Sequence, residues 1–384
     1  MTTHVARRSF LASATLGAVA VAQKGASQSP NASPAPGFIL RQQTPLNLES
    51  PLSALESFAT PTEQFFVRSH SAVPQIAAAT WALEIGGAVE RPLRINHEEL
   101  LRLPARTQHT TFECAGNNRV SLTPRERGLL WGPGAVGNAE WTGVSLATLL
   151  ERAGPQNRAV DVVLEGADEA TANEEPRTPG AIRFARSLPI AKARQADVIL
   201  AYRMNGRDLT AAHGFPVRAV VPGWYGVASV KWLTRITVLE QSFQGYYHTL
   251  EYSYWDRTGV TPVLRSVGEM DVKATILRPS IEEAIPSGQP YPIQGVAWTG
   301  DATVARVEVS VDGGTNWAMA RLLGDAVPNA WRRWEFPWHN PQPGRTAIMA
   351  RATDSRGRVQ PLTRQLDNRN SMISYVLPIN VVVR

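Results

Sequence analysis

Short alternating runs of apolar and polar residues, with few long amphipathic stretches, characterise the first part of the chain. Residues 81–85 alternate in this way before two glycines, which predicts a strand, and we expect regular structure to start there. Leu146, Leu149 and Leu150 recur at helical spacing after residues 141–144, which we interpret as a turn that opens a helix. Further strands are predicted at 160–164, 198–202 and 216–221. Strands and helices mixed in this manner predict an α+β domain.

Beyond about Val263 the pattern changes to short strands separated by Gly, Pro and Asp, with no convincing helix between them. The predicted strands are 272–276, 291–298, 305–311, 334–338, 346–353 and 379–383. Asp312-Gly313-Gly314 is a hairpin-turn signal. This pattern predicts an all-β sandwich of immunoglobulin-like shape.

The N-terminus carries a twin-arginine pair, Arg7-Arg8, followed by a short apolar stretch at 11–22. This stretch is too short to cross a bilayer, which takes about 20 residues. We therefore expect residues 1–22 to be a twin-arginine signal peptide and the mature protein to be periplasmic, without a membrane span. Residues 23–60 are rich in Ser, Pro, Ala and Gln, which predicts a flexible leader segment.

Length, charge and cysteine content limit the number of domains, the class of partner and the role of the thiol. A chain of 384 residues exceeds what one hydrophobic core usually serves, so we expect two further domains, at 61–262 and 263–384. The net charge is +6, but basic runs interleaved with aromatic residues are absent from the sequence, which argues against a nucleic-acid partner. The single cysteine permits no internal disulfide, so its thiol is a small buried hydrophobe, a reactive group or a metal ligand.

The residues around Cys114 suggest the third of these roles without establishing it. Ala115 and Gly116 allow a bulky group to approach the backbone, and Arg119 favours the thiolate that binds soft metals. An inert core position nevertheless remains the commoner role of a lone cysteine.

The segment 114–119, Cys-Ala-Gly-Asn-Asn-Arg, resembles the molybdenum-binding loop of the sulfite oxidase family. Other segments resemble motifs of that family in the same order: 66–70 (Phe-Val-Arg-Ser-His), 213–218 (His-Gly-Phe-Pro-Val-Arg), 221–223 with 230–232, and 307–314, which is similar to a hairpin of the family's dimerisation domain. The resemblance implies molybdenum bound by molybdopterin, with Cys114 as its protein ligand. By position, the residues implied to bind the pterin and its phosphate are Phe66, Arg68, His70, Asp168, His213, Arg218, Ser229 and Lys231.

The resemblance also implies a substrate pocket for a small sulfur oxyanion. Arg68, Arg119 and Arg369 would supply its positive charge, Tyr252 a hydrogen bond beside the metal, and Trp131 a wall. Three nearby tyrosines, at 246, 247 and 254, leave the choice of Tyr252 open to a shift. Two departures from the family pattern are Asn118, where animal enzymes carry an arginine, and Ser69, where an asparagine is usual.

The function implied is the oxidation of sulfite to sulfate by a periplasmic sulfite dehydrogenase. The sequence contains no haem-binding CxxCH, so electrons would pass one at a time to an external acceptor such as cytochrome c, and the C-terminal domain would form a homodimer. One alternative is a related molybdopterin oxidoreductase that acts on sulfane sulfur or a sulfoxide. The sulfane-oxidising branch departs from Cys-Ala-Gly-Asn and the sulfoxide-reducing branch lacks the sandwich, which favours sulfite. A second alternative is a non-enzymatic exported binding protein with an inert cysteine.

Overall fold

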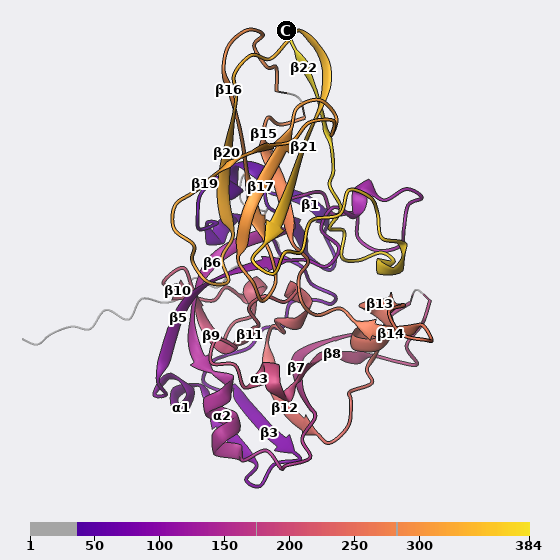
Figure 1. Cartoon of the computed structure of the whole chain (residues 1–384). Helices are drawn as coiled ribbons and strands as arrows, with labels where there is room; N and C mark the ends of the chain where they lie inside the picture. Colours follow the sequence, from indigo (N-terminus) through magenta and orange to yellow (C-terminus); the bar gives the residue numbers. More distant parts are fainter. Residues whose placement is uncertain (1–36, 174, 282) are drawn as a thin grey trace, which may run out of the picture. The chain divides into compact units, whose positions relative to one another are not determined.

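Strands make up most of the regular structure of the chain, and its helices are few and short (Figure 1). The computed structural model describes residues 37–173, 175–281 and 283–384. The predicted signal peptide and the first part of the predicted leader lie outside these residues. Within them, no helix combines the length and apolar character needed to cross a membrane.

One antiparallel sheet ends directly at the single cysteine. Its strand order is β10-β9-β6-β5, and β11 also pairs with β9. The strands are β5 (Ala105–Glu113), β6 (Val136–Ser145), β9 (Ile199–Met204), β10 (Arg207–Asp208) and β11 (Arg218–Val220). Cys114 therefore follows the last residue of β5, and Arg218 opens β11.

The predicted turn at residues 141–144 is wrong, because these residues lie inside β6. Gly143 pairs with Ala201 of β9, and a Cβ added to Gly143 would lie 2.2 Å from the carbonyl oxygen of Leu200. The glycine thus allows two strands to approach closely and does not mark a turn. The helix predicted to follow is confirmed as α2 (Leu146–Ala153), which buries its three leucines.

A second sheet has the strand order β4-β3-β12-β7-β8. Its strands are β3 (Ala82–Gly87), β4 (Leu93–Asn96), β7 (Asp161–Ala170), β8 (Ile182–Pro189) and β12 (Leu233–Leu239). β12 runs parallel to β3 and antiparallel to β7. Two short helices, α1 (His97–Leu101) and α3 (Ile190–Ala193), follow β4 and β8. The long loop after β12 contains the π-helical turn η6 (Tyr246–Glu251), which leads into a separate hairpin of β13 (Ser253–Asp256) and β14 (Val263–Ser266).

Regular structure begins earlier than the alternation at 81–85 predicted. β1 (Ile39–Gln42) and β2 (Asn47–Glu49) form an antiparallel pair inside the segment predicted as a flexible leader. The Glu49 carboxylate is buried and accepts the backbone N–H groups of Gly132 and Gly134 at 2.8 and 3.0 Å. The polar composition of this segment predicted an exposed, flexible leader. Some of its polar side chains are instead buried, where they accept hydrogen bonds from backbone N–H groups.

The predicted C-terminal strands are all present, in two four-stranded antiparallel sheets of order β15-β16-β20-β19 and β18-β17-β21-β22. Their bounds are β15 (Lys273–Arg278), β16 (Tyr291–Trp298), β17 (Val304–Ser310), β18 (Ala318–Met319), β19 (Arg321–Leu323), β20 (Arg332–Trp338), β21 (Gly344–Asp354) and β22 (Ile379–Val383). The turn signal at Asp312 lies between β17 and β18, where the Asp312 carboxylate accepts the N–H groups of Thr315 and Asn316, both at 3.0 Å. Apolar residues of these strands share one buried cluster.

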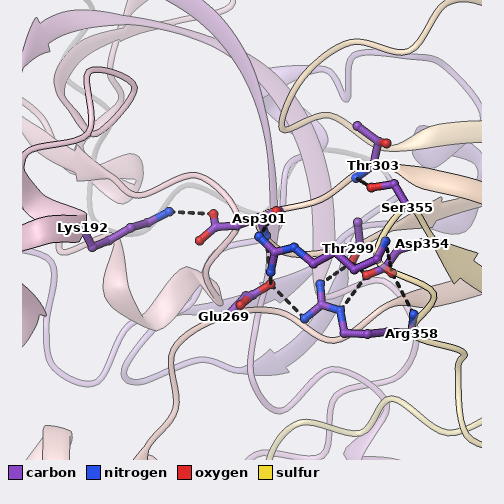
Figure 2. Close-up of polar contacts among 9 residues, drawn as sticks. Lys192, Glu269, Thr299, Asp301, Thr303, Asp354, Ser355 and Arg358 are labelled. Atoms are coloured by element: carbon purple, nitrogen blue, oxygen red, sulfur yellow. Dashed lines mark hydrogen bonds and ion pairs between the residues drawn. The ribbon is translucent and has the colours of Figure 1, made fainter.

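A network of ionic contacts joins the C-terminal strands to preceding parts of the chain (Figure 2). Lys192 of α3 is almost fully buried and lies 2.7 Å from Asp301, in the loop before β17. Arg358, after β21, lies between Glu269 and Asp354 at 2.9 and 2.7 Å. Partly buried ion pairs of this kind fix the position of one segment against another.

Candidate functional site

A buried cavity collects most of the residues that the sequence singled out. It is lined by Phe66, Arg68, His70, Cys114, Asp168, His213, Arg218, Ser229, Lys231 and Tyr252, among others. These residues come from the ends of β5 and β7, from β11, and from the loops that precede β3, β11, β12 and β13. Strands and loops distant in the sequence therefore converge on one chemical site.

Cys114 occupies a rigid turn at the end of β5. Its N–H donates to the carbonyl of Ala135 at 2.9 Å, and its own carbonyl accepts the N–H of Asn117 at 2.8 Å. A Cβ added to Gly116 would lie 2.3 Å from the Arg119 guanidinium, so this glycine lets the cation lie against the loop. Burial raises the pKa of the Cys114 thiol, and the charges of Arg68 and Arg119 oppose that rise.

Arg218 is a buried cation whose hydrogen bonds in the described part of the chain go only to main-chain oxygens. It donates to the carbonyls of His213 and Ser229 at 3.1 and 2.9 Å and lies over the rings of Phe112 and Trp141. Burial lowers the pKa of Arg218 to about 9, so it stays charged at neutral pH. A buried charge without a carboxylate partner favours an anion in the adjacent cavity.

Lys231 adds a second cation beside Arg218. Its Nζ donates to the carbonyl of Ala212 at 2.9 Å and to the hydroxyl of Ser69 at 3.2 Å. Burial and the charge of Arg218 hold the pKa of Lys231 well below its usual range, although Asp168 opposes this. Ser69, the departure noted in the sequence, thus provides a hydroxyl that contacts the lysine.

The neighbouring ionisable groups compensate this positive charge only in part. Burial raises the pKa of Asp168 to about 6, and Lys231 opposes the rise. Burial, then the charges of Arg218 and Lys231, lower the pKa of His213 to about 3, so its ring is neutral. Gly214 has φ +105°, and a Cβ there would lie 3.0 Å from the Arg218 side chain, so only glycine brings this loop against the cations without strain.

His70 and Tyr252 also line the cavity and contact each other. The Nε2 of His70 lies 2.7 Å from the hydroxyl of Tyr252, and the His70 ring stacks on Phe184. Burial and the charge of Arg68 keep the pKa of His70 well below its usual range. The pKa of Arg68 is raised although burial lowers it, because Tyr252 and Cys114 favour its charged form. Of the four nearby tyrosines, Tyr252 lines this cavity together with Cys114.

Three predicted pocket residues do not line the cavity. Trp131 is fully buried and meets Phe66 edge-on at 6.5 Å, so it supports a lining residue and is not a wall. Arg119 donates to the carbonyls of Asn370 and Leu129, both at 2.7 Å, and its positive charge is the second of those that lower the Cys114 thiol pKa. These contacts commit the Nε and Nη1 donors of Arg119 to the main chain.

Arg369 also lies outside the cavity. Its guanidinium donates to the Ser253 hydroxyl at 2.7 Å and to the Leu250 carbonyl at 3.1 Å, on either side of Tyr252 in the sequence. Arg369 is thus absent from the lining of this cavity, and its Nη1 binds the segment that carries the tyrosine, so its place in the substrate pocket stays a prediction.

Two functional features escaped the sequence analysis. Glu113, next to the cysteine, is buried and accepts from Lys273 at 2.7 Å and from the indole N–H of Trp298 at 2.8 Å. A hollow that shares Arg68 and His70 with the cavity is flanked by an ion pair of Arg127 and Glu251 at 2.9 Å. The only sequence signal for the buried Glu113 was its place between two apolar residues. Nothing in the sequence indicated the hollow.

Two family models match the chain: an oxidoreductase molybdopterin binding domain over residues 70–247 and a Mo-co oxidoreductase dimerisation domain over residues 265–379. The chain is 35% identical to the sulfite oxidase of Gallus gallus over 344 residues, which cover 85% of this chain and 73% of that protein. It is also 35% identical to the mitochondrial sulfite oxidase of Rattus norvegicus over 350 residues, but spans only 62% of that protein's length. It is 34% identical to nitrate reductase [NADH] 1 of Arabidopsis thaliana over 74% of this chain and 33% of that protein.

Among solved structures, the chain resembles the sulfane dehydrogenase SoxCD from Paracoccus pantotrophus. The TM-score is 0.76 and the sequence identity 31%, and the match covers 87% of this chain and 84% of the SoxCD chain. The likeness therefore extends over both the cavity-bearing sheets and the C-terminal strands.

Proposed function

Because the chain belongs to the sulfite oxidase family of molybdopterin-dependent oxidoreductases, we propose that it oxidises sulfite to sulfate. The observation that carries this proposal is the placement of Cys114, Arg68 and Tyr252 on one buried cavity. A soft ligand, a fixed cation and a hydrogen-bonding hydroxyl are the groups that a molybdenum site for a small oxyanion needs.

The residues of the cavity fit molybdopterin. Arg218 is buried and Lys231 partly buried, and the hydrogen bonds of both in the described residues go only to neutral oxygens, so a bound phosphate would favour the charged form of each. The close approach at Gly214 keeps the His213 loop against these cations. Cys114 would be the sulfur donor in the same cavity. We propose that His70, Asp168, Ser229 and Phe66 complete the contacts to the pterin.

Bound molybdenum supplies the two-electron chemistry that adds an oxygen to sulfur. The chain's own residues gather and orient the substrate. Arg68 would bind the sulfite oxygens, and its interactions with Tyr252 and Cys114 favour its charged form. His70 holds the Tyr252 hydroxyl, which can donate to the bound anion. Because the pKa of His70 is low, its ring is neutral and adds no positive charge beside the tyrosine.

Arg119 and Arg369 take different parts in this proposal. The charge of Arg119 favours the Cys114 thiolate, while its Nε and Nη1 donate to main-chain carbonyls. Arg369 fixes the segment that carries Tyr252. Trp131 supports Phe66 from behind.

Metal analysis and a sulfite assay test the proposal together. Purified protein should contain about one molybdenum and one pterin per chain and should reduce ferricyanide or cytochrome c in the presence of sulfite. Cys114→Ser should lose turnover, while Ser53→Ala, at an exposed position, serves as the matched control. Full turnover by Cys114→Ser would refute the role of the thiolate.

We further propose that electrons leave one at a time to an external acceptor such as cytochrome c. The matched dimerisation domain supports a homodimer formed through the C-terminal sheets. We propose that these two sheets form an immunoglobulin-like sandwich. The twin-arginine sequence supports export by that route to the periplasm, with residues 1–22 removed. We propose domains at 61–262 and 263–384.

The structural likeness to SoxCD favours a second candidate, the oxidation of sulfane sulfur. Parallel assays with sulfite, a sulfane-sulfur donor, a sulfoxide and nitrate separate these activities. The molybdopterin binding domain favours any of them over a binding protein with an inert cysteine.

A further inference from the structure

Arg186 is a fully buried arginine just outside the cavity. It lies in β8, and its side chain has 0% exposure. In the described part of the chain all its hydrogen bonds go to main-chain carbonyls, and its Nε is buried without a partner. Burial lowers the pKa of Arg186 to about 10, so the group remains a cation at neutral pH. Burying such a charge without a carboxylate is costly, which argues for a role beyond packing.

The carbonyls that Arg186 binds lie on both sides of Tyr252. One Nη donates to the carbonyls of Tyr247 and His248 in η6, at 2.6 and 3.3 Å, immediately before the tyrosine. The other Nη donates to the carbonyl of Val267. The N–H of Val267 in turn donates to the carbonyl of Tyr252 at 2.9 Å. The Arg186 guanidinium thus fixes both the turn that leads into Tyr252 and Val267, the residue whose N–H binds the Tyr252 carbonyl.

The same cation lies against the tyrosine itself. The Cζ of Arg186 is 5.9 Å from the centroid of the Tyr252 ring, and the hydroxyl of that ring reaches His70 at 2.7 Å. The turn η6, which precedes Tyr252, is π-helical. Such turns are rare and often occur at functional sites. A planar cation with several donors can hold such a turn where a neutral side chain could not.

We propose that Arg186 is a positioning residue, which holds the Tyr252 side chain in the cavity by fixing the main chain before and opposite it. Arg186 does not line the cavity, so it acts through Tyr252. The inference rests on the proposed function only where turnover of sulfite is the measurement.

A double-mutant cycle tests the inference. Arg186→Met should lower kcat/KM for sulfite by about 100-fold, because a misplaced catalytic group costs on that order. Arg186→Lys should retain more activity, since it keeps the charge and part of the bonding, and it carries the test if Arg186→Met fails to fold. Arg183→Met, in the same strand but exposed, is the matched control and should match wild type.

The decisive comparison is made in the Tyr252→Phe background. If Arg186 acts through the Tyr252 hydroxyl, replacing Arg186 should have almost no further effect there. If the losses from Arg186→Met and Tyr252→Phe multiply, the arginine acts elsewhere and the inference is overturned. Equal molybdenum content in all variants shows that the loss does not come from the cofactor.

Hydrogen exchange provides a readout that does not depend on turnover. Arg186→Met should raise exchange selectively at residues 246–252 and at Val267, with Arg186→Lys intermediate and Arg183→Met unchanged. If the wild type does not oxidise sulfite, the proposed function fails, and this measurement alone decides the inference. Unchanged protection at 246–252 would then overturn it.

Discussion

Glu113, which precedes Cys114, forms a buried ion pair with Lys273 of the C-terminal strand β15, with Oε1 and Nζ 2.7 Å apart. Both side chains are 2% exposed. The other carboxylate oxygen accepts the indole N–H of Trp298 in β16. Lys273 also donates to the carbonyl of Ile373 at 2.7 Å. The residue that places the thiol is therefore held by the C-terminal sheets, which links their integrity to the geometry of the cavity.

Lys273→Met should destabilise the protein by about 3 to 5 kcal/mol, because it leaves a buried carboxylate without its cation. Urea unfolding measures this loss. The double variant Glu113→Gln with Lys273→Met should be more stable than Lys273→Met alone. Arg102→Met, which breaks an exposed pair with Glu98, should cost less than about 1 kcal/mol and serves as the control. A cost that small for Lys273→Met would show that the buried pair does not hold the two parts together.

Lys231→Met should weaken cofactor binding about 10- to 100-fold, since a charge-assisted bond to a phosphate contributes about 1.5 to 3 kcal/mol. Molybdenum and pterin contents after dialysis measure the effect. Arg235→Met, an exposed residue in the following strand, should keep the wild-type content. Equal retention by Lys231→Met would place the phosphate elsewhere.

Tyr252→Phe should lower kcat for sulfite by about 100-fold while molybdenum content stays constant, because it removes the hydroxyl that His70 holds. Steady-state kinetics provide the test. Tyr254→Phe, two residues farther and outside the cavity, should behave as wild type. The assignment of the tyrosine would be wrong if these two variants exchanged their effects.

His248 should make the protein less stable as the pH falls. Burial lowers the pKa of His248 to about 3 from 6.5, so between these values the unfolded chain binds more protons than the folded one. Stability linked to His248 is therefore complete above pH 6.5 and falls by about 1.4 kcal/mol for each pH unit below it. Unfolding of wild type and His248→Gln should show a difference that narrows from pH 6.5 to 5.5. A constant difference would indicate that His248 keeps its ordinary pKa.

The sequence predicted the strands whose alternation matches one buried face. Residues 291–298 and 379–383 became β16 and β22 with the same bounds. It failed where polar residues serve the interior, as at Glu49 and Glu113, because composition does not show which carboxylates accept buried N–H groups. Gly143 misled for a related reason, since a close strand pair and a turn both select glycine.

The candidate site followed a similar division. Residues within local motifs, such as Cys114 and His213, were found because those motifs resemble segments of the sulfite oxidase family. Arg186 could not be found, because its partners in η6 and at Val267 lie about 60 and 81 positions away in the sequence. Arg369 was assigned to the pocket by the family resemblance, but the tertiary contacts direct its guanidinium to Ser253.

X-ray absorption at the molybdenum edge, compared between wild type and Cys114→Ser, tests the central claim most directly. If the Cys114 thiolate binds molybdenum in this cavity, wild type should show one sulfur neighbour more than the serine variant at equal pterin content. Identical sulfur coordination in the two proteins, or a wild-type protein without molybdenum, would contradict the account.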